Sequence, residues 1–94
     1  MVEETGTDVD AVLDKRGAFY GTFTGVARVA QHFKHCLKQG DSYHKLAPDQ
    51  KEALDLIATK LARIVNGDPE YADSWVDIAG YAKLVADRLQ GKER

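Results

Sequence analysis

Four charged residues lie on two successive segments of helical character, and their types suit a phosphate-bearing ligand. Lys60 and Arg63 are three residues apart, so they share one side of a helix. Asp73 and Asp77 are four residues apart on the helix that follows. Lysine and arginine both donate to phosphate oxygens, arginine through two parallel hydrogen bonds. Alternatively the basic and acidic residues pair with one another and only fix the helix register, which spacing alone favours.

Other residues could extend such a site. Tyr20 lies in a segment rich in glycine and aromatic residues, where a ring can stack on a base and the backbone can approach a ligand. Arg28 follows on the polar flank of the next helix. Tyr81 neighbours Asp77, and its simplest role is a core position with its hydroxyl on that carboxylate.

The sequence predicts neither a metal site nor a catalytic nucleophile. His32 and Cys36 have the four-residue spacing that a metal ion could use, but His44 is the only other histidine outside that helix. A zinc site needs three or four ligands. No recognisable motif would activate the single cysteine.

Helical periodicity and capping signals predict an all-α fold: a small bundle of three main helices plus a short N-terminal one. No alternation typical of a strand occurs. We expect one domain over residues 8–90, with flexible ends at 1–7 and 91–94. The expected elements are a helix from Asp8 to Gly17, a shaped loop over 17–25, a helix from Thr22 or Thr24 to Lys38, a loop over 40–47, a helix from Pro48 to Asn66, and a helix from Asp68 or Asp73 to Leu89.

The last of these helices is apolar on more than one side. Its main stripe consists of Trp75, Ile78, Ala82, Val85 and Leu89, while Val76 and Leu84 fall on other faces. A helix of this kind is usually buried between partners. Because the chain is short, we expect a second subunit to supply some of the cover and the protein to be a homo-oligomer.

Composition restricts the possible functions. The 94 residues carry a net charge of −2, which gives no general attraction for nucleic acid. Charges interrupt every apolar stretch, so neither a membrane span nor a signal peptide is predicted. One cysteine permits no internal disulfide and fits a reducing compartment. We therefore expect a cytoplasmic protein.

The block from Asp73 to Tyr81, Asp-Ser-Trp-Val-Asp-Ile-Ala-Gly-Tyr, resembles a motif of an uncharacterised domain family common in bacteriophages. Arg16 and the pair Tyr20-Gly21 match the early part of the same pattern. The resemblance runs from about Arg16 to Leu89 and implies no established activity. With it, the predicted ligand-binding residues are Lys60, Arg63, Asp73, Asp77, Tyr20, Arg16, Arg28 and Tyr81.

The helical hairpin is more distantly similar to all-α NTP pyrophosphohydrolases of the MazG type, in which acidic pairs on two helices hold Mg²⁺. When the two hairpins are aligned by this pattern, the first acidic pair of those enzymes corresponds to Lys60 and Arg63 of this chain. Basic side chains can neutralise phosphates, but they neither bind Mg²⁺ nor activate water. The resulting hypothesis is binding of a nucleotide or cyclic nucleotide without hydrolysis and without a cofactor, such as sequestration of a host immune messenger by a phage.

Two alternatives remain open at this point. The first is a Mg²⁺-dependent pyrophosphohydrolase, which requires that Glu52 and Asp55 converge with Asp73 and Asp77 on one metal ion. The second is a structural or protein-binding helical module.

Overall fold

The computed structural model describes residues 8–94, and four α-helices and one short 3₁₀ helix make up its regular structure. The helices are α1 (Val9–Tyr20), α2 (Phe23–Leu37), α3 (Pro48–Asn66) and α4 (Ala72–Leu89), with the 3₁₀ helix at Tyr43–Lys45. The predicted all-α class with three main helices and a short N-terminal one is confirmed. The predicted flexible end at residues 1–7 lies outside the described residues.

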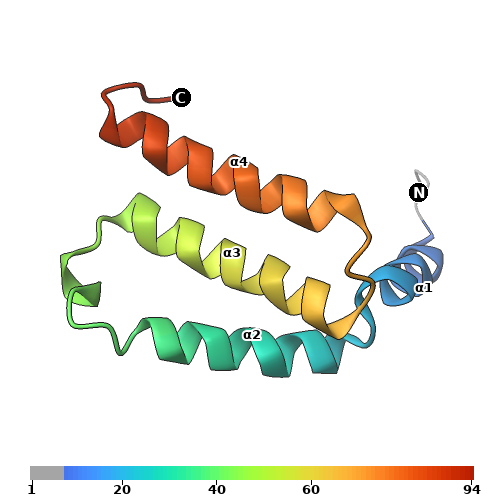
Figure 1. The fold of residues 1–94 in the computed structure, drawn as a ribbon. Coiled ribbons are helices and arrows are strands. Elements are labelled where there is room, and N and C mark those ends of the chain that lie inside the picture. Colours follow the sequence, from blue (N-terminus) through green and yellow to red (C-terminus); the bar gives the residue numbers. More distant parts are fainter. Residues whose placement is uncertain (1–7) are drawn as a thin grey trace.

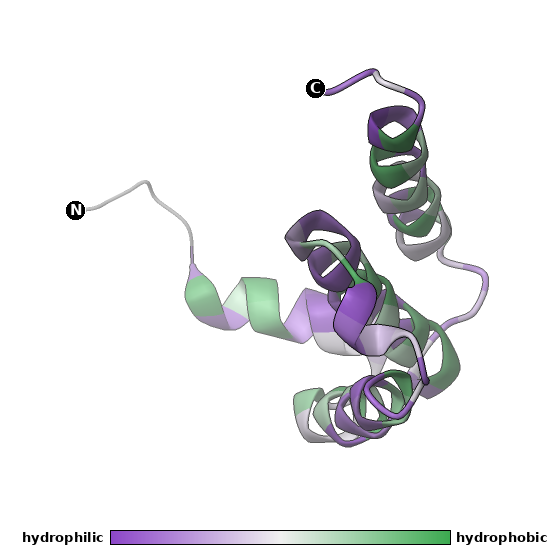
Figure 2. Cartoon of the chain, turned by 90° about the vertical axis from the view of Figure 1, so that its left-hand side faces the viewer, coloured by the Kyte–Doolittle hydropathy of each residue, from purple (hydrophilic) through white to green (hydrophobic). Residues whose placement is uncertain are grey.

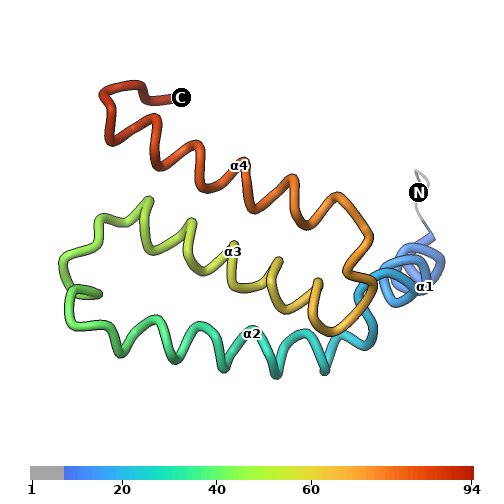
Figure 3. Tube along the Cα trace, viewed as in Figure 1, coloured from blue at the N-terminus to red at the C-terminus, as the bar shows by residue number. Residues whose placement is uncertain are grey.

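The three main helices form a flat layer (Figure 1). The helices α2 and α4 pack along opposite sides of α3 (Figure 3). The helix α1 contacts α2 and α3 near one end of the layer and projects away from it on one side (Figure 2). As a consequence α3 has neighbours on two sides only, and much of α1 and α4 is exposed.

Small residues build the core where α2 crosses α3. Val26, Ala30 and Ala62 form its buried centre, and Tyr20 and Val29 pack against them. Alanines on both helices allow close approach of the backbones, but each buries little apolar area. Within residues 8–94, no large side chain is fully buried. Most of the larger apolar side chains are partly or largely exposed.

Local signals explain most helix ends. The Asp8 carboxylate caps the start of α1 by accepting from the backbone N–H of Asp10 at 3.0 Å. The Thr22 hydroxyl caps α2 by accepting from the N–H of Gly25 at 3.1 Å. Pro48 occupies the first turn of α3, as predicted, and α3 ends at Asn66-Gly67.

One predicted helix boundary was wrong, and of two candidate starts for the last helix the structure favours one. The helix α1 does not stop at Gly17 but continues to Tyr20, because Phe19 and Tyr20 gain packing partners there and Gly21, with φ of 79°, makes the turn. The helix α4 begins at Ala72, within one residue of the predicted start at Asp73 and not at the other candidate, Asp68. The N–H of Asp68 donates to the Phe19 carbonyl at 2.7 Å, which holds this segment as a loop.

The predicted apolar stripe of α4 is not a buried stripe. Trp75 is 53% exposed and Leu89 60%, and Ala82 is also exposed. Trp75, the largest residue of that stripe, is therefore not part of the core of a single chain. Of the five stripe residues, only Ile78 and Val85 are half-buried. The reason is that α3 covers one side of α4 and no other described helix covers the rest.

One ion pair joins the start of α3 to the end of α4, and two others lie at the end of α4 itself. Arg88 donates to both oxygens of Asp49, at 2.8 and 2.6 Å. Lys83 and Arg94 both pair with the buried Asp87, so the residues after α4 fold back on the helix. The hydrogen bond from Arg88 lowers the pKa of Asp49, and those from Lys83 and Arg94 lower the pKa of Asp87.

Removing the Arg88 guanidinium should lower stability only at pH values at which Asp49 is ionised. A carboxyl group whose pKa is lower in the folded than in the unfolded state stabilises the fold at pH values above its unfolded pKa of about 3.9. That contribution is lost as the pH falls through the folded-state pKa. Arg88→Gln should therefore lower the melting temperature by a few degrees at most near neutral pH, since the pair is exposed. Thermal melts at pH 7 and below pH 3 measure this. A difference that persists unchanged at the lower pH would contradict the role of the ion pair.

Candidate functional site

A cavity of about 460 Å³ lies between α1, the start of α2 and the C-terminal half of α3. We call it the arginine cavity. It is of the size that small-molecule sites in proteins usually have, about 300–1,000 Å³. The lining residues are Leu13, Arg16, Gly17, Tyr20, Gly21, Thr22, Phe23, Val26, Thr59 and Arg63.

The charge of the arginine cavity is entirely positive. Arg16 from α1 and Arg63 from α3 are the two charged residues among its described lining, and no carboxylate faces it. The cavity also meets the N-terminus of α2, where free backbone N–H groups carry partial positive charge. In a chain of net charge −2, this is a local site that favours an anion.

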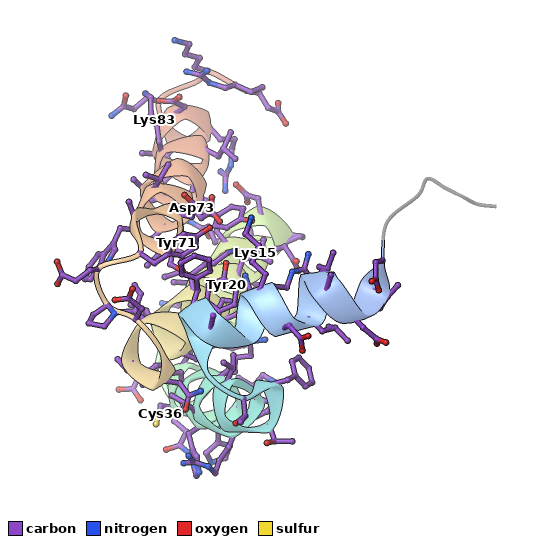
Figure 4. The ribbon with its side chains drawn as sticks, turned by 90° about the vertical axis from the view of Figure 1, so that its right-hand side faces the viewer. Lys15, Tyr20, Cys36, Tyr71, Asp73 and Lys83 are labelled. Carbon is purple, nitrogen blue, oxygen red and sulfur yellow. The ribbon has the colours of Figure 1, made fainter. Side chains whose placement is uncertain are left out.

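Aromatic packing holds one of these arginines in place. The guanidinium of Arg63 lies over the ring of Tyr20, 4.5 Å from the ring centroid. Tyr20 in turn meets Tyr71 edge to face at 6.0 Å, and Tyr71 stacks on Phe19 at 3.9 Å. Figure 4 shows Tyr20 and Tyr71 together at this junction. The stack restrains Arg63, so less entropy is lost when it binds a ligand.

The junction between the α1–α2 turn and the α3–α4 loop sets the position of α1. The side-chain amide of Asn66 donates to the carbonyls of Tyr20 at 2.9 Å and Thr22 at 3.3 Å. Gly67 lies directly against the backbone of Phe19 and Tyr20. The pairs Tyr20-Gly21 and Asn66-Gly67 therefore meet, and their contact brings Arg16 to the same cavity as Arg63.

The predicted four-residue cluster does not form a single site. Lys60 pairs with Asp77 at 2.9 Å and is largely buried, with 16% of its side chain exposed. This contact joins α3 to α4 and matches the structural alternative. Arg63 points instead to the arginine cavity, on another side of α3. The cluster is divided because side chains three residues apart differ by about 60° around the helix, and on the central helix of the layer this is enough for Lys60 to reach α4 and Arg63 to reach the cavity beside α1.

The other predicted residues lie in three places. Asp73 accepts from the Tyr71 hydroxyl at 2.8 Å, and this hydrogen bond raises the pKa of Tyr71. Arg28 is exposed on α2 and is not part of the lining. Tyr81 lines two shallow hollows beside α4, neither of which has a lining residue from α1, and no hydrogen bond joins it to Asp77. Of the eight predicted residues, the cavity brings together Arg16, Tyr20 and Arg63.

The acidic residues of the pyrophosphohydrolase alternative do not converge. Asp77 is paired with Lys60 and Asp73 with Tyr71, while Glu52 borders a hollow at the other end of the α3–α4 pair. Over the described residues, no three His, Cys, Asp or Glu side chains form a group that could hold a metal ion. The arrangement that Mg²⁺ catalysis would require is not found there.

Two threonines in the lining were missed from the sequence. Thr59 precedes Arg63 by four residues, so the helical spacing alone could have placed both on one side of α3. Its hydroxyl now donates to the Asp55 carbonyl at 3.3 Å. Thr22 was considered as a helix start only. Nothing in the sequence showed that the start of α2 would face Arg16.

Comparisons with known proteins give a family but no activity. No curated protein and no solved structure matches the chain. None of the helices within residues 8–94 is long and apolar enough to cross a membrane. One family model, described as a domain of unknown function (DUF6378), matches residues 7–89 and so covers the whole four-helix unit, including the cavity and the junction. The chain belongs to the DUF6378 family.

Proposed function

We propose that the protein binds a phosphate-bearing nucleotide or cyclic nucleotide in the arginine cavity and does not hydrolyse it. The observation that carries this proposal is the pairing of Arg16 and Arg63 across one cavity with no carboxylate in its described lining. Two guanidinium groups without an acidic partner favour a ligand of at least one full negative charge.

The rest of the lining suits the remainder of a nucleotide. Phe23 is 83% exposed at the edge of the cavity, so one face of its ring is free to stack on a base. Phe19, from the same glycine- and aromatic-rich segment as Tyr20, already stacks on Tyr71. Thr22 and Thr59 line the same cavity, and their hydroxyl groups could contact a sugar or phosphate oxygen.

Retention without turnover follows from the chemistry of these groups. Arginine neutralises phosphate charge, but it cannot take a proton from water at neutral pH or hold a divalent cation. The cavity therefore supplies binding and no general base. In the bacteriophage setting that the Asp73–Tyr81 block suggests, such a protein would sequester a nucleotide messenger of bacterial immunity in the host cytoplasm.

A ligand panel tests the proposal. The protein is incubated with nucleoside mono-, di- and triphosphates and with cyclic dinucleotides, with and without Mg²⁺, and the bound fraction is separated and heat-denatured. We expect one class to be depleted from solution and recovered intact, with no requirement for Mg²⁺. Formation of pyrophosphate would indicate the MazG-type enzyme instead. If no compound is depleted, both nucleotide functions are wrong and a structural or protein-binding module remains.

A further inference from the structure

The side of the α3–α4 pair that faces away from α1 carries a broad apolar surface. On α4 it includes the exposed Trp75 and Leu89, and on α3 it includes Leu61, 38% exposed, and Val65, 65% exposed. Between the two helices lies an apolar hollow of about 290 Å³, bordered by Leu54 and Ala82 among others. Monomeric proteins rarely expose a continuous apolar area of this kind.

Along α4 this surface follows a coiled-coil spacing. The five residues are 75, 79, 82, 86 and 89, with intervals of four, three, four and three, and all five are exposed. Such intervals keep side chains on one narrow seam of a helix. None of the five is charged. We call this series the α4 seam; it consists of Trp75, Ala79, Ala82, Ala86 and Leu89.

The α4 seam is complementary to itself when a second copy runs antiparallel. With the two-fold axis at Ala82, each Trp75 faces the second copy's Leu89, and each Ala79 faces the second copy's Ala86. The large residues then lie at the two ends and the alanines in the middle, where two backbones can approach closely. A closed two-fold contact requires this kind of self-complementary surface.

We infer that the protein is a homodimer in which two copies of α4 pack antiparallel through the α4 seam, about a two-fold axis at Ala82. The indole of Trp75 is already held for this contact, because its N–H donates to the Pro69 carbonyl at 2.9 Å. Leu61 and Val65 of α3 widen the contact beyond one helix, toward the roughly 800 Å² per partner of a stable interface. Two helical hairpins then face each other, as in a four-helix bundle.

The dimer contact and the arginine cavity lie on different sides of α3. Thr59 and Arg63 are about half a turn around the helix from Leu61 and Val65. The cavity therefore stays open in the dimer. Dimerisation and ligand binding can be tested separately, and failure of one leaves the other standing.

Sedimentation equilibrium from about 1 to 100 µM tests the dimer, alongside the emission of the single tryptophan. We expect a mass of twice the 10.4 kDa chain mass and a blue-shifted Trp75 emission as concentration rises. Ala82→Arg places two guanidinium groups together at the axis and should weaken association about a hundredfold or more. Ala18→Arg, an equal change at an exposed alanine of α1, should leave the mass unchanged.

A cross-link locates the axis and does not depend on the arginine variant. In a Cys36→Ser background, Ala82→Cys should form an intermolecular disulfide under mild oxidation, because only residues at the axis meet their own copies within the about 4.4–6.8 Å that a disulfide spans between Cα atoms. Ala18→Cys in the same background should not. A wild-type mass of one chain at 100 µM would overturn the proposal. So would a dimer that neither responds to Ala82→Arg nor cross-links at position 82.

Discussion

Arg63→Ala is expected to weaken nucleotide binding by about ten- to a hundredfold and to cost little stability. Hydrogen bonds between a guanidinium and a phosphate contribute about 1.5–3 kcal/mol, which corresponds to that range in affinity. In the free protein Arg63 makes one aromatic contact, with Tyr20. Its loss should lower the free energy of unfolding by only about 1 kcal/mol.

Lys60→Ala is the matched control for this variant. Lys60 is on the same helix and carries the same single positive charge. It is paired with Asp77, however, and does not line the arginine cavity. It should lower stability and leave affinity within about twofold, because its ion pair joins α3 to α4 and involves no residue of the cavity lining. Isothermal titration with the nucleotide retained in the panel, together with urea unfolding, measures both quantities. Equal losses of affinity and stability in Arg63→Ala would support a purely structural arginine.

Gly67→Ala should be the most destabilising small substitution in the chain, by about 3 kcal/mol. A Cβ at this position would overlap the Phe19 carbonyl oxygen and the Tyr20 backbone. These are main-chain atoms, so no side chain can rotate away to relieve the overlap. The Asp68–Phe19 hydrogen bond at 2.7 Å would be lost as well. Because the junction positions α1, this variant should also weaken nucleotide binding.

Gly80→Ala, at a glycine of α4, is expected to raise stability rather than lower it. No atom outside the helix lies within 4 Å of the Cβ that it would add. Alanine in place of glycine in a helix should stabilise the fold by about 0.5–1 kcal/mol. Urea unfolding followed by circular dichroism compares the two variants. If Gly67→Ala were as stable as Gly80→Ala, the junction could not be what holds α1 in place.

The sequence was sufficient for the fold because the strongest signals are local. Pro48 at a helix start, Asn66-Gly67 at a helix end and the spacing of apolar residues on α3 act within one or two turns. Predictions that needed long-range information were less accurate. The continuation of α1 to Tyr20 depends on Tyr71, some fifty residues later, and the loop at Asp68 depends on a hydrogen bond to Phe19. Neither partner can be inferred from local propensity.

The same limit applies to the site. Lys60 and Arg63 looked equivalent in sequence, yet helix geometry sends one to α4 and the other to α1. Arg16 could be connected with Arg63 only through resemblance, because the distance between them depends on the Asn66 bridge to the α1–α2 turn. The exposure of Trp75 has a different cause. Its apolar character was clear from the sequence, but whether a helix of the same chain or a second copy covers it depends on the arrangement of the layer.

The most direct test of nucleotide binding in the arginine cavity is a titration of the ¹⁵N-labelled protein with ATP, GTP and a cyclic dinucleotide, followed by amide chemical shifts. At least one of the three should produce saturable shifts, with no product formed. The largest changes should fall on the cavity lining: Arg16, Tyr20, Thr22, Phe23, Thr59 and Arg63. Shifts centred instead on Lys60, Asp77 and Tyr81, or no saturable shift with any of the three compounds, would contradict this site.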